Sequence, residues 1–70
     1  MEPREQFAAN LRRLRGEAEL TQERLGALAS MHPTEISRLE RAVRDPQLST
    51  LVRIARALGV SPCDLLAEIE

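Results

Sequence analysis

The chain has 70 residues and a formal net charge of −1, and 43% of its residues are hydrophobic but only one is aromatic. This length supports one domain with a small core, and the scarcity of aromatic and β-branched residues favours packed helices over a sheet. No apolar run reaches the roughly 18 residues of a membrane-spanning helix, and the first residues lack the apolar core of a signal peptide. We therefore expect a cytoplasmic protein without membrane contact.

Side chains suited to enzyme chemistry are scarce. His32 is the single histidine and Cys63 the single cysteine, no further metal ligand stands near either, and there is no glycine-rich phosphate loop. Cys63 has no partner for an internal disulfide and is interpreted as a packing or surface residue. We expect no enzyme activity and no metal, cofactor or small-molecule ligand.

The charges are unevenly distributed along the chain. Residues 36–56 carry five arginines and two acidic residues, whereas residues 57–70 carry three acidic residues and no basic one. A basic middle and an acidic end fit a DNA-facing surface with a second face turned away, although an ordinary mixed surface has the same pattern.

The first half of the chain predicts two helices. One runs from about Glu5 to Ala18 after a frayed start over residues 1–4, and its inner stripe contains Phe7, Leu11 and Leu14. Another runs from about Gln22 to Ala29, because the Thr21 hydroxyl is well placed to accept from free backbone N–H groups at its start.

A third helix is predicted from about Pro33 to Arg41, since proline at the first position of a helix loses no hydrogen bond. His32 occupies its N-cap in place of the usual serine or threonine, and Glu35 can still reach back to the His32 N–H, which leaves half of a capping box. Helical spacing places Ile36, Leu39 and Val43 on the inner side and Thr34, Ser37, Arg38 and Arg41 on the outer side.

The remainder predicts two more helices. Asp45-Pro46 interrupts the chain, and a helix from about Leu48 to Leu58 follows, ended by Gly59. Its expected buried residues are Leu48, Leu51, Ile54, Ala55 and Leu58. A short fifth helix begins after Ser61-Pro62 and carries Leu65, Leu66 and Ile69; the first two point about 100° apart, so one packs inside and the other is left for a partner.

The stretch LTQERLGALASMHPTEISRLER, followed by RDPQLSTLVRIARALGVSPCDLL, resembles the Cro and phage-repressor type of helix-turn-helix family, also called XRE-like, over about residues 7–67. The resemblance implies an all-α, compact five-helix, lambda-repressor-like domain over residues 1–70, whose third helix lies in the DNA major groove. Glu19, Ser30 and Ala42 stand where this family commonly has glycine, which leaves open how the backbone leaves those helices.

The resemblance also implies which residues contact DNA. Base-reading positions fall on Pro33, Thr34, Ser37 and Arg38. Arg38 is the one long forked donor among them, suited to the O6 and N7 atoms of guanine or, alternatively, to phosphate alone. The phosphate contacts are assigned to Thr21 and Gln22 at the start of the second helix, and to Arg41 and Arg44.

One charged pair is predicted to be structural. Arg15 lies at the edge of the apolar stripe of the first helix, and Glu40 is directed toward the interior side of the third. A carboxylate placed there needs a partner, and similar proteins pair an arginine with a glutamate at these positions, so we expect an Arg15–Glu40 salt bridge.

The sequence thus predicts a sequence-specific, double-stranded DNA-binding transcriptional regulator of prokaryotic or phage type, associated with the nucleoid. One copy offers few contacts, so we expect a homodimer on a palindromic operator. Related proteins commonly dimerise through the chain's end, here Leu65, Leu66 and Ile69. Control of restriction–modification genes, an antitoxin and a phage repressor all remain open. The alternative is an antitoxin-like or partner-docking helical module with weak or no specific DNA binding.

Overall fold

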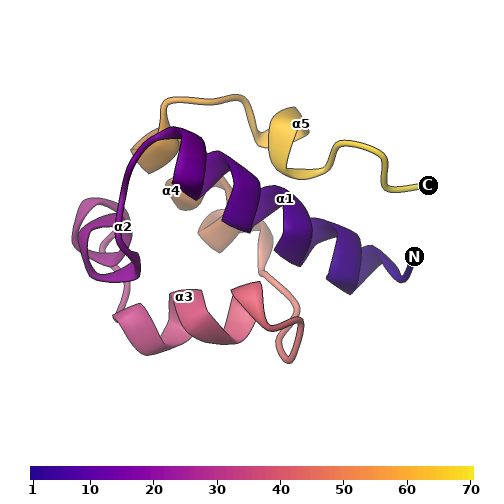
Figure 1. Ribbon diagram of the computed structural model, residues 1–70, viewed down its shortest axis with the longest axis horizontal. Helices are drawn as coiled ribbons and strands as arrows, with labels where there is room; N and C mark the ends of the chain where they lie inside the picture. Colours follow the sequence, from indigo (N-terminus) through magenta and orange to yellow (C-terminus); the bar gives the residue numbers. More distant parts are fainter.

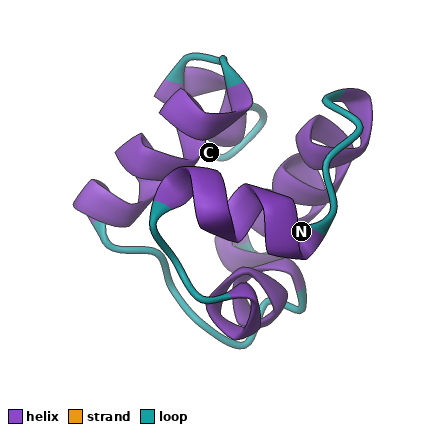
Figure 2. Cartoon of the chain, turned by 90° about the vertical axis from the view of Figure 1, so that its left-hand side faces the viewer, coloured by secondary structure: helices purple, strands orange, loops and turns teal.

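The chain folds into five helices and no strand in a computed structural model that describes residues 1–70 (Figure 2). The all-α, five-helix fold predicted from the sequence is confirmed, and no helix is both long and apolar enough to cross a bilayer. In chain order the helices are α1 (Pro3–Glu17), α2 (Gln22–Ala29), α3 (Pro33–Glu40), α4 (Leu48–Leu58) and α5 (Pro62–Leu65).

The long helix α1 lies across the other elements (Figure 1). It packs against α3 on one side and α5 on the other, while α2 packs against α3 and α4, and α4 against α5. Both ends of the chain lie at the same end of the molecule (Figure 1). This arrangement holds the short α3 between α1 and α2 along one side and leaves its other side free.

Each helix contributes one fully buried aliphatic side chain to a single core: Leu11, Leu25, Ile36, Ile54 and Leu65. The predicted inner stripe of α1 is confirmed, because its three residues are all buried. A core built from one to three residues per helix requires every helix to keep its place, so the fold couples the position of α3 to all the others.

Two apolar residues expected inside are exposed. Val43 is 56% exposed because α3 ends at Glu40 and the left-handed backbone at Ala42 turns the chain away before Val43 can pack. Leu48 is 78% exposed, since it is the first residue of α4 and extends beyond the core that Leu51 and Ile54 reach.

Helix α1 begins two residues earlier than expected. Pro3 occupies its first position, and the backbone N–H of Glu2 donates to Oε1 of Glu5 at 3.3 Å. These two features extend the helix over Pro3 and Arg4, which were expected to be frayed.

The family's usual glycine positions keep a left-handed backbone in this chain although none of them is glycine. Glu19 and Ser30 have φ of 58° and Ala42 has φ of 61°. Each is followed by a backbone hydrogen bond that closes the helix end: Leu20 N–H to Arg15 O, Met31 N–H to Gly26 O, and Val43 N–H to Arg38 O. Non-glycine residues in this conformation cost about 1–2 kcal/mol each, which the closing bonds offset.

The turn between α2 and α3 packs directly on α2. A Cβ atom at Gly26 would lie 2.6 Å from the carbonyl oxygen of Met31, closer than real contacts allow. The absence of a side chain at Gly26 therefore lets the turn approach the helix and fixes where α3 begins.

Candidate DNA-binding surface

Helix α3 starts from a complete capping arrangement. Nδ1 of His32 accepts from the Thr34 N–H at 3.1 Å, and Oε1 of Glu35 accepts from the His32 N–H at 3.2 Å. The sequence predicted only the second of these bonds. The imidazole replaces the usual hydroxyl as acceptor, so the start of α3 is as well defined as in a serine- or threonine-capped helix.

The two sides of α3 differ in burial. Ile36, Leu39 and Glu40 are at most 4% exposed and face the core. The predicted base-reading residues are on the other side: Thr34 and Arg38 are exposed, whereas Pro33 and Ser37 are half-buried. The structure therefore brings the four base-reading candidates together on one outward surface.

Residues from α2 extend this surface. Thr21 and Gln22 line a shallow surface hollow together with Pro33, Thr34 and Ser37. The Thr21 hydroxyl accepts from the Arg24 N–H at 3.0 Å and is otherwise exposed. The N-terminus of α2 thus lies beside the outer side of α3, as two adjoining DNA contacts require.

Arg41 is exposed at the end of α3, and its Nε donates to the Ser37 hydroxyl at 3.2 Å. Because the hydroxyl accepts this bond, it keeps its own hydrogen to donate outward. The terminal nitrogens of Arg41 make no protein hydrogen bond, which leaves them for an anion.

Gln22, which was predicted to contact phosphate, also binds within the protein. Its side-chain nitrogen, Nε2, donates to Oε1 of Glu40 at 3.0 Å, and the residue is half-buried. One of its two amide hydrogens is therefore bound to the buried Glu40 carboxylate, and the other makes no bond within the protein. Gln22 braces α3 against α2.

Glu40 is the centre of a buried polar network behind α3. Arg15 binds its carboxylate with two nitrogens, Nε to Oε2 at 2.5 Å and Nη2 to Oε1 at 3.0 Å, and Arg15 also donates to the carbonyl of Leu20. Arg12 donates to the backbone carbonyl of Glu40. The structure thus brings the predicted pair, Arg15 and Glu40, into contact. The hydrogen bond to Glu40 raises the pKa of Arg15 above its ordinary value, so the guanidinium remains charged.

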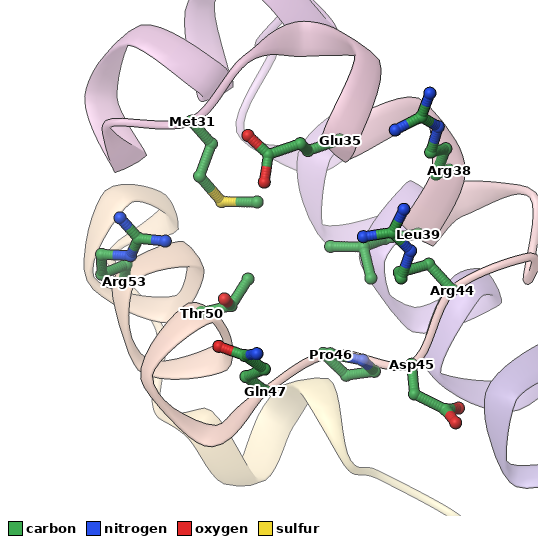
Figure 3. Close-up of a pocket in the computed structure, with 10 residues that line it drawn as sticks. All are labelled: Met31, Glu35, Arg38, Leu39, Arg44, Asp45, Pro46, Gln47, Thr50 and Arg53. Carbon is green, nitrogen blue, oxygen red and sulfur yellow. The ribbon is translucent and has the colours of Figure 1, made fainter.

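A second hollow, of about 220 Å³, lies between α3 and α4 (Figure 3). Arg38 and Arg44 lie on one side of it and Arg53 on the other (Figure 3). None of the three takes part in a salt bridge. No sequence motif marks Arg53 as a site residue; its only signal was membership of the basic segment 36–56, and its approach to α3 follows from helix packing.

The acidic residue beside Arg44 is engaged elsewhere. Asp45 accepts from Nε of Arg4 at 2.8 Å and from Nη2 of Arg4 at 3.3 Å. This hydrogen bond raises the pKa of Arg4. In Figure 3 the Asp45 carboxylate points away from the hollow, so the loop presents Arg44 without its neighbour's negative charge.

The residues assigned to dimerisation separate in the structure. Leu65 is fully buried in the core and has no surface to offer a partner, which corrects its assignment. Leu66 is 44% exposed and Ile69 is half-buried. Both lie beyond α5, which ends at Leu65, because this helix is shorter than expected.

Comparisons with known proteins agree with this architecture. A family model described as a helix-turn-helix domain matches residues 6–68. An HTH-type transcriptional regulator, y4dJ, of Sinorhizobium fredii is 41% identical over 94% of this chain and 86% of its own length. The control protein C.BamHI of Bacillus amyloliquefaciens is 38% identical over 86% of this chain and 75% of its own.

Among solved structures, the restriction-modification controller protein C.AhdI from Aeromonas hydrophila superposes with a TM-score of 0.86 at 31% identity, covering 89% of this chain and 94% of its own. These relatives are named as regulators and not as enzymes. The chain therefore belongs to the helix-turn-helix domain family, in the Cro and phage-repressor (XRE-like) class of DNA-binding regulators that its motif predicted.

Proposed function

We propose that the protein is a sequence-specific transcriptional regulator that places α3 in the major groove of duplex DNA. The observation that carries this proposal is the outer side of α3, where Thr34 and Arg38 are exposed and Arg38 forms no salt bridge. Two short donors and one forked donor on a supported helix match the hydrogen-bonding groups of base edges.

The dimensions suit this role. An α-helix with its side chains is about 10–12 Å across, which matches the roughly 12 Å width of the major groove, and the 8 residues of α3 make it about 12 Å long. Thr34, Ser37 and Arg38 read the base edges in this proposal. Thr21, Arg41 and Arg44 flank them and bind phosphates, which set the register of the helix on the duplex.

The proposed active form is a homodimer on a palindromic operator. A single α3 reaches only a few base pairs, and two copies with half-sites about 34–36 Å apart double the contacts. The exposed Leu66 and the half-buried Ile69 are the apolar residues we assign to the contact between copies. The acidic residues near the chain's end then face away from the phosphates.

The relatives favour one kind of regulated gene. C.BamHI and C.SmaI are control proteins, at 38% and 39% identity, and C.AhdI is a restriction-modification controller protein. We therefore place restriction–modification control ahead of an antitoxin or a phage-repressor role for this chain.

Selection of bound duplexes from a random library tests the DNA-reading proposal. We expect enrichment of one inverted repeat whose half-sites are about 34–36 Å apart. With about 6–10 phosphate contacts, affinity for that site should fall about 10³–10⁵-fold between about 50 and 200 mM salt. A protein-docking module would enrich no sequence at any salt concentration, and that outcome would reject the proposal.

A further inference from the structure

The hollow between α3 and α4 has the chemistry of an anion site. Its polar lining includes the guanidinium group of Arg53 and the hydroxyl of Thr50 on the α4 side, and the guanidinium group of Arg44 on the opposite side (Figure 3). We propose that this hollow seats one phosphate group, held by Arg44, Arg53 and Thr50, and that Arg4 keeps the seat open by holding Asp45 away from it.

The three arginines of the hollow have no acidic partner in the protein. Arg38, Arg44 and Arg53 form no salt bridge. The one hydrogen bond among them runs from Nη1 of Arg53 to the carbonyl of Ser30 and is long, at 3.4 Å. Several guanidinium groups around one small space repel each other, and a phosphate group relieves this repulsion while accepting paired N–H bonds from each.

Of the two carboxylates near the hollow, Asp45 is paired with a cation, whereas Glu35 lines the hollow and keeps its negative charge, which three arginines outweigh. Oε1 of Glu35 accepts from the His32 N–H at the start of α3. Both oxygens of Asp45 accept from Arg4, a residue 41 positions earlier in the chain. Without Arg4, the Asp45 side chain is free to turn toward the adjacent Arg44. Arg4 is thus a positioning residue, because it acts on the hollow only by holding the Asp45 carboxylate away from Arg44.

The seat adjoins the proposed base-reading surface, because Arg38 contributes to both. A backbone phosphate flanking the bases read by α3 is therefore one source of the group. A free phosphate-bearing anion has the same chemistry and would compete with DNA for Arg44. This inference rests on the proposed function only for the first source, so the two sources require separate measurements.

The first experiment compares Arg53→Gln with Arg56→Gln. Both variants remove one charge from α4, but Arg56 does not line the hollow. We expect Arg53→Gln to reduce the slope of log affinity against log salt by about 1, equally on all DNA sequences, and Arg56→Gln to change it less.

In parallel, inorganic phosphate is titrated into each protein without DNA, and the arginine Nε–H signals are followed by NMR. Saturable shifts at Arg44 and Arg53 in wild type, with the Arg44 shift lost in Arg53→Gln, identify a free anion as an occupant. A changed salt slope without such shifts identifies the DNA backbone as the source. If Arg53→Gln and Arg56→Gln behave alike in both measurements, the seat does not exist. The phosphate titration can show or exclude the anion site even if the wild-type protein binds no specific DNA sequence. Failure of the anion-site proposal can therefore be distinguished from failure of the proposed DNA-binding function.

The second experiment tests Arg4 with a double-mutant cycle. An exposed ion pair involving Asp45 has a modest effect, so we expect Arg4→Gln to weaken DNA binding about two- to fivefold. Asp45→Asn should raise affinity more in the Arg4→Gln protein than in wild type, because only there is Asp45 free to approach Arg44. Equal effects of Asp45→Asn in both backgrounds would show that Arg4 does not act through Asp45.

Discussion

The inner and outer sides of α3 use charge in opposite ways. On the inner side, Glu40 is 4% exposed and accepts from both Arg15 and Gln22. On the outer side, Arg38 is exposed and has no acidic partner. A buried charge must be fully paired to persist, whereas an exposed unpaired guanidinium remains able to bind a ligand. The inner side therefore fixes the orientation of α3, and the outer side is the one that we propose for DNA recognition.

These different roles of the inner and outer sides follow from the short length of α3. A helix of 8 residues is far shorter than the about 12–15 residues needed for stability alone. Its position therefore depends on what the inner side contacts. The Glu40 network joins α1, α2 and α3, and a displacement of any of them would tilt the recognition surface.

The largest effect is expected from Arg15→Met, which leaves the Glu40 carboxylate buried with only Gln22 as a side-chain partner. We expect the free energy of unfolding to fall by about 3 kcal/mol, the low end for breaking a buried pair because Arg15 is partly exposed. Urea denaturation measures the change. Arg13→Met, on the same helix but in an exposed pair with Glu17, should change stability by less than about 0.5 kcal/mol. Equal losses in the two variants would contradict a special role for the inner network.

The stabilisation from Arg15 should not depend on pH near neutrality. Its pKa is raised in the folded protein, so its contribution is complete below the unfolded-state pKa and is lost only as pH rises through the folded-state value. Both values lie far above neutral pH. Denaturation of wild type at about pH 6 to 9 should therefore show no loss attributable to this group.

A substitution on the outer side of α3 should change DNA recognition and leave stability nearly unchanged, the reverse of what we expect for Arg15 on the inner side. Arg38→Ala is expected to leave stability within about 0.5 kcal/mol of wild type, since the side chain is exposed and unpaired. It should lower discrimination at one base position by about 1–3 kcal/mol. Competition between the selected operator and single-base variants measures this. If Arg38→Ala instead weakens all sequences equally, Arg38 binds phosphate and the base-reading assignment passes to Thr34 and Ser37 alone.

The N-cap of α3 belongs to neither side of the helix, and its loss should lower the free energy of unfolding by an intermediate amount. His32→Ala removes the acceptor for the Thr34 N–H and is expected to cost about 1 kcal/mol. His32→Ser supplies a hydroxyl acceptor and should retain most of the stability. Thermal unfolding of the three proteins distinguishes these outcomes; if serine and alanine behave alike, the imidazole is not a functioning cap.

Local patterns predicted the five helices and most of the inner and outer sides of α3, because the spacing of apolar residues and the positions of Pro33 and Pro62 are local signals; they missed the exposure of Val43 and the early end of α5. The approach of Arg53 to Arg44 depends on how α4 packs, and the Arg4–Asp45 pair joins residues 41 positions apart. Gln22 could not be assigned its inward direction without the position of Glu40. The features of the site that the sequence alone did not predict are therefore those that depend on contacts between side chains far apart in the chain.

The smallest effect concerns Ala42, where the chain leaves α3 for the loop that carries Arg44. Its φ of 61° is strained for alanine but not for glycine. We expect Ala42→Gly to raise the free energy of unfolding by about 0.5–1 kcal/mol, the relieved strain being partly offset by the greater entropy of the unfolded chain. Ala27→Gly is the matched control, because Ala27 is an exposed residue within α2, where glycine costs about 1 kcal/mol. Opposite signs for the same substitution in urea denaturation, with operator affinity unchanged by Ala42→Gly, would show that the backbone at Ala42 is strained and that the outer side of α3 does not depend on this strain; a loss of stability in both variants would contradict it.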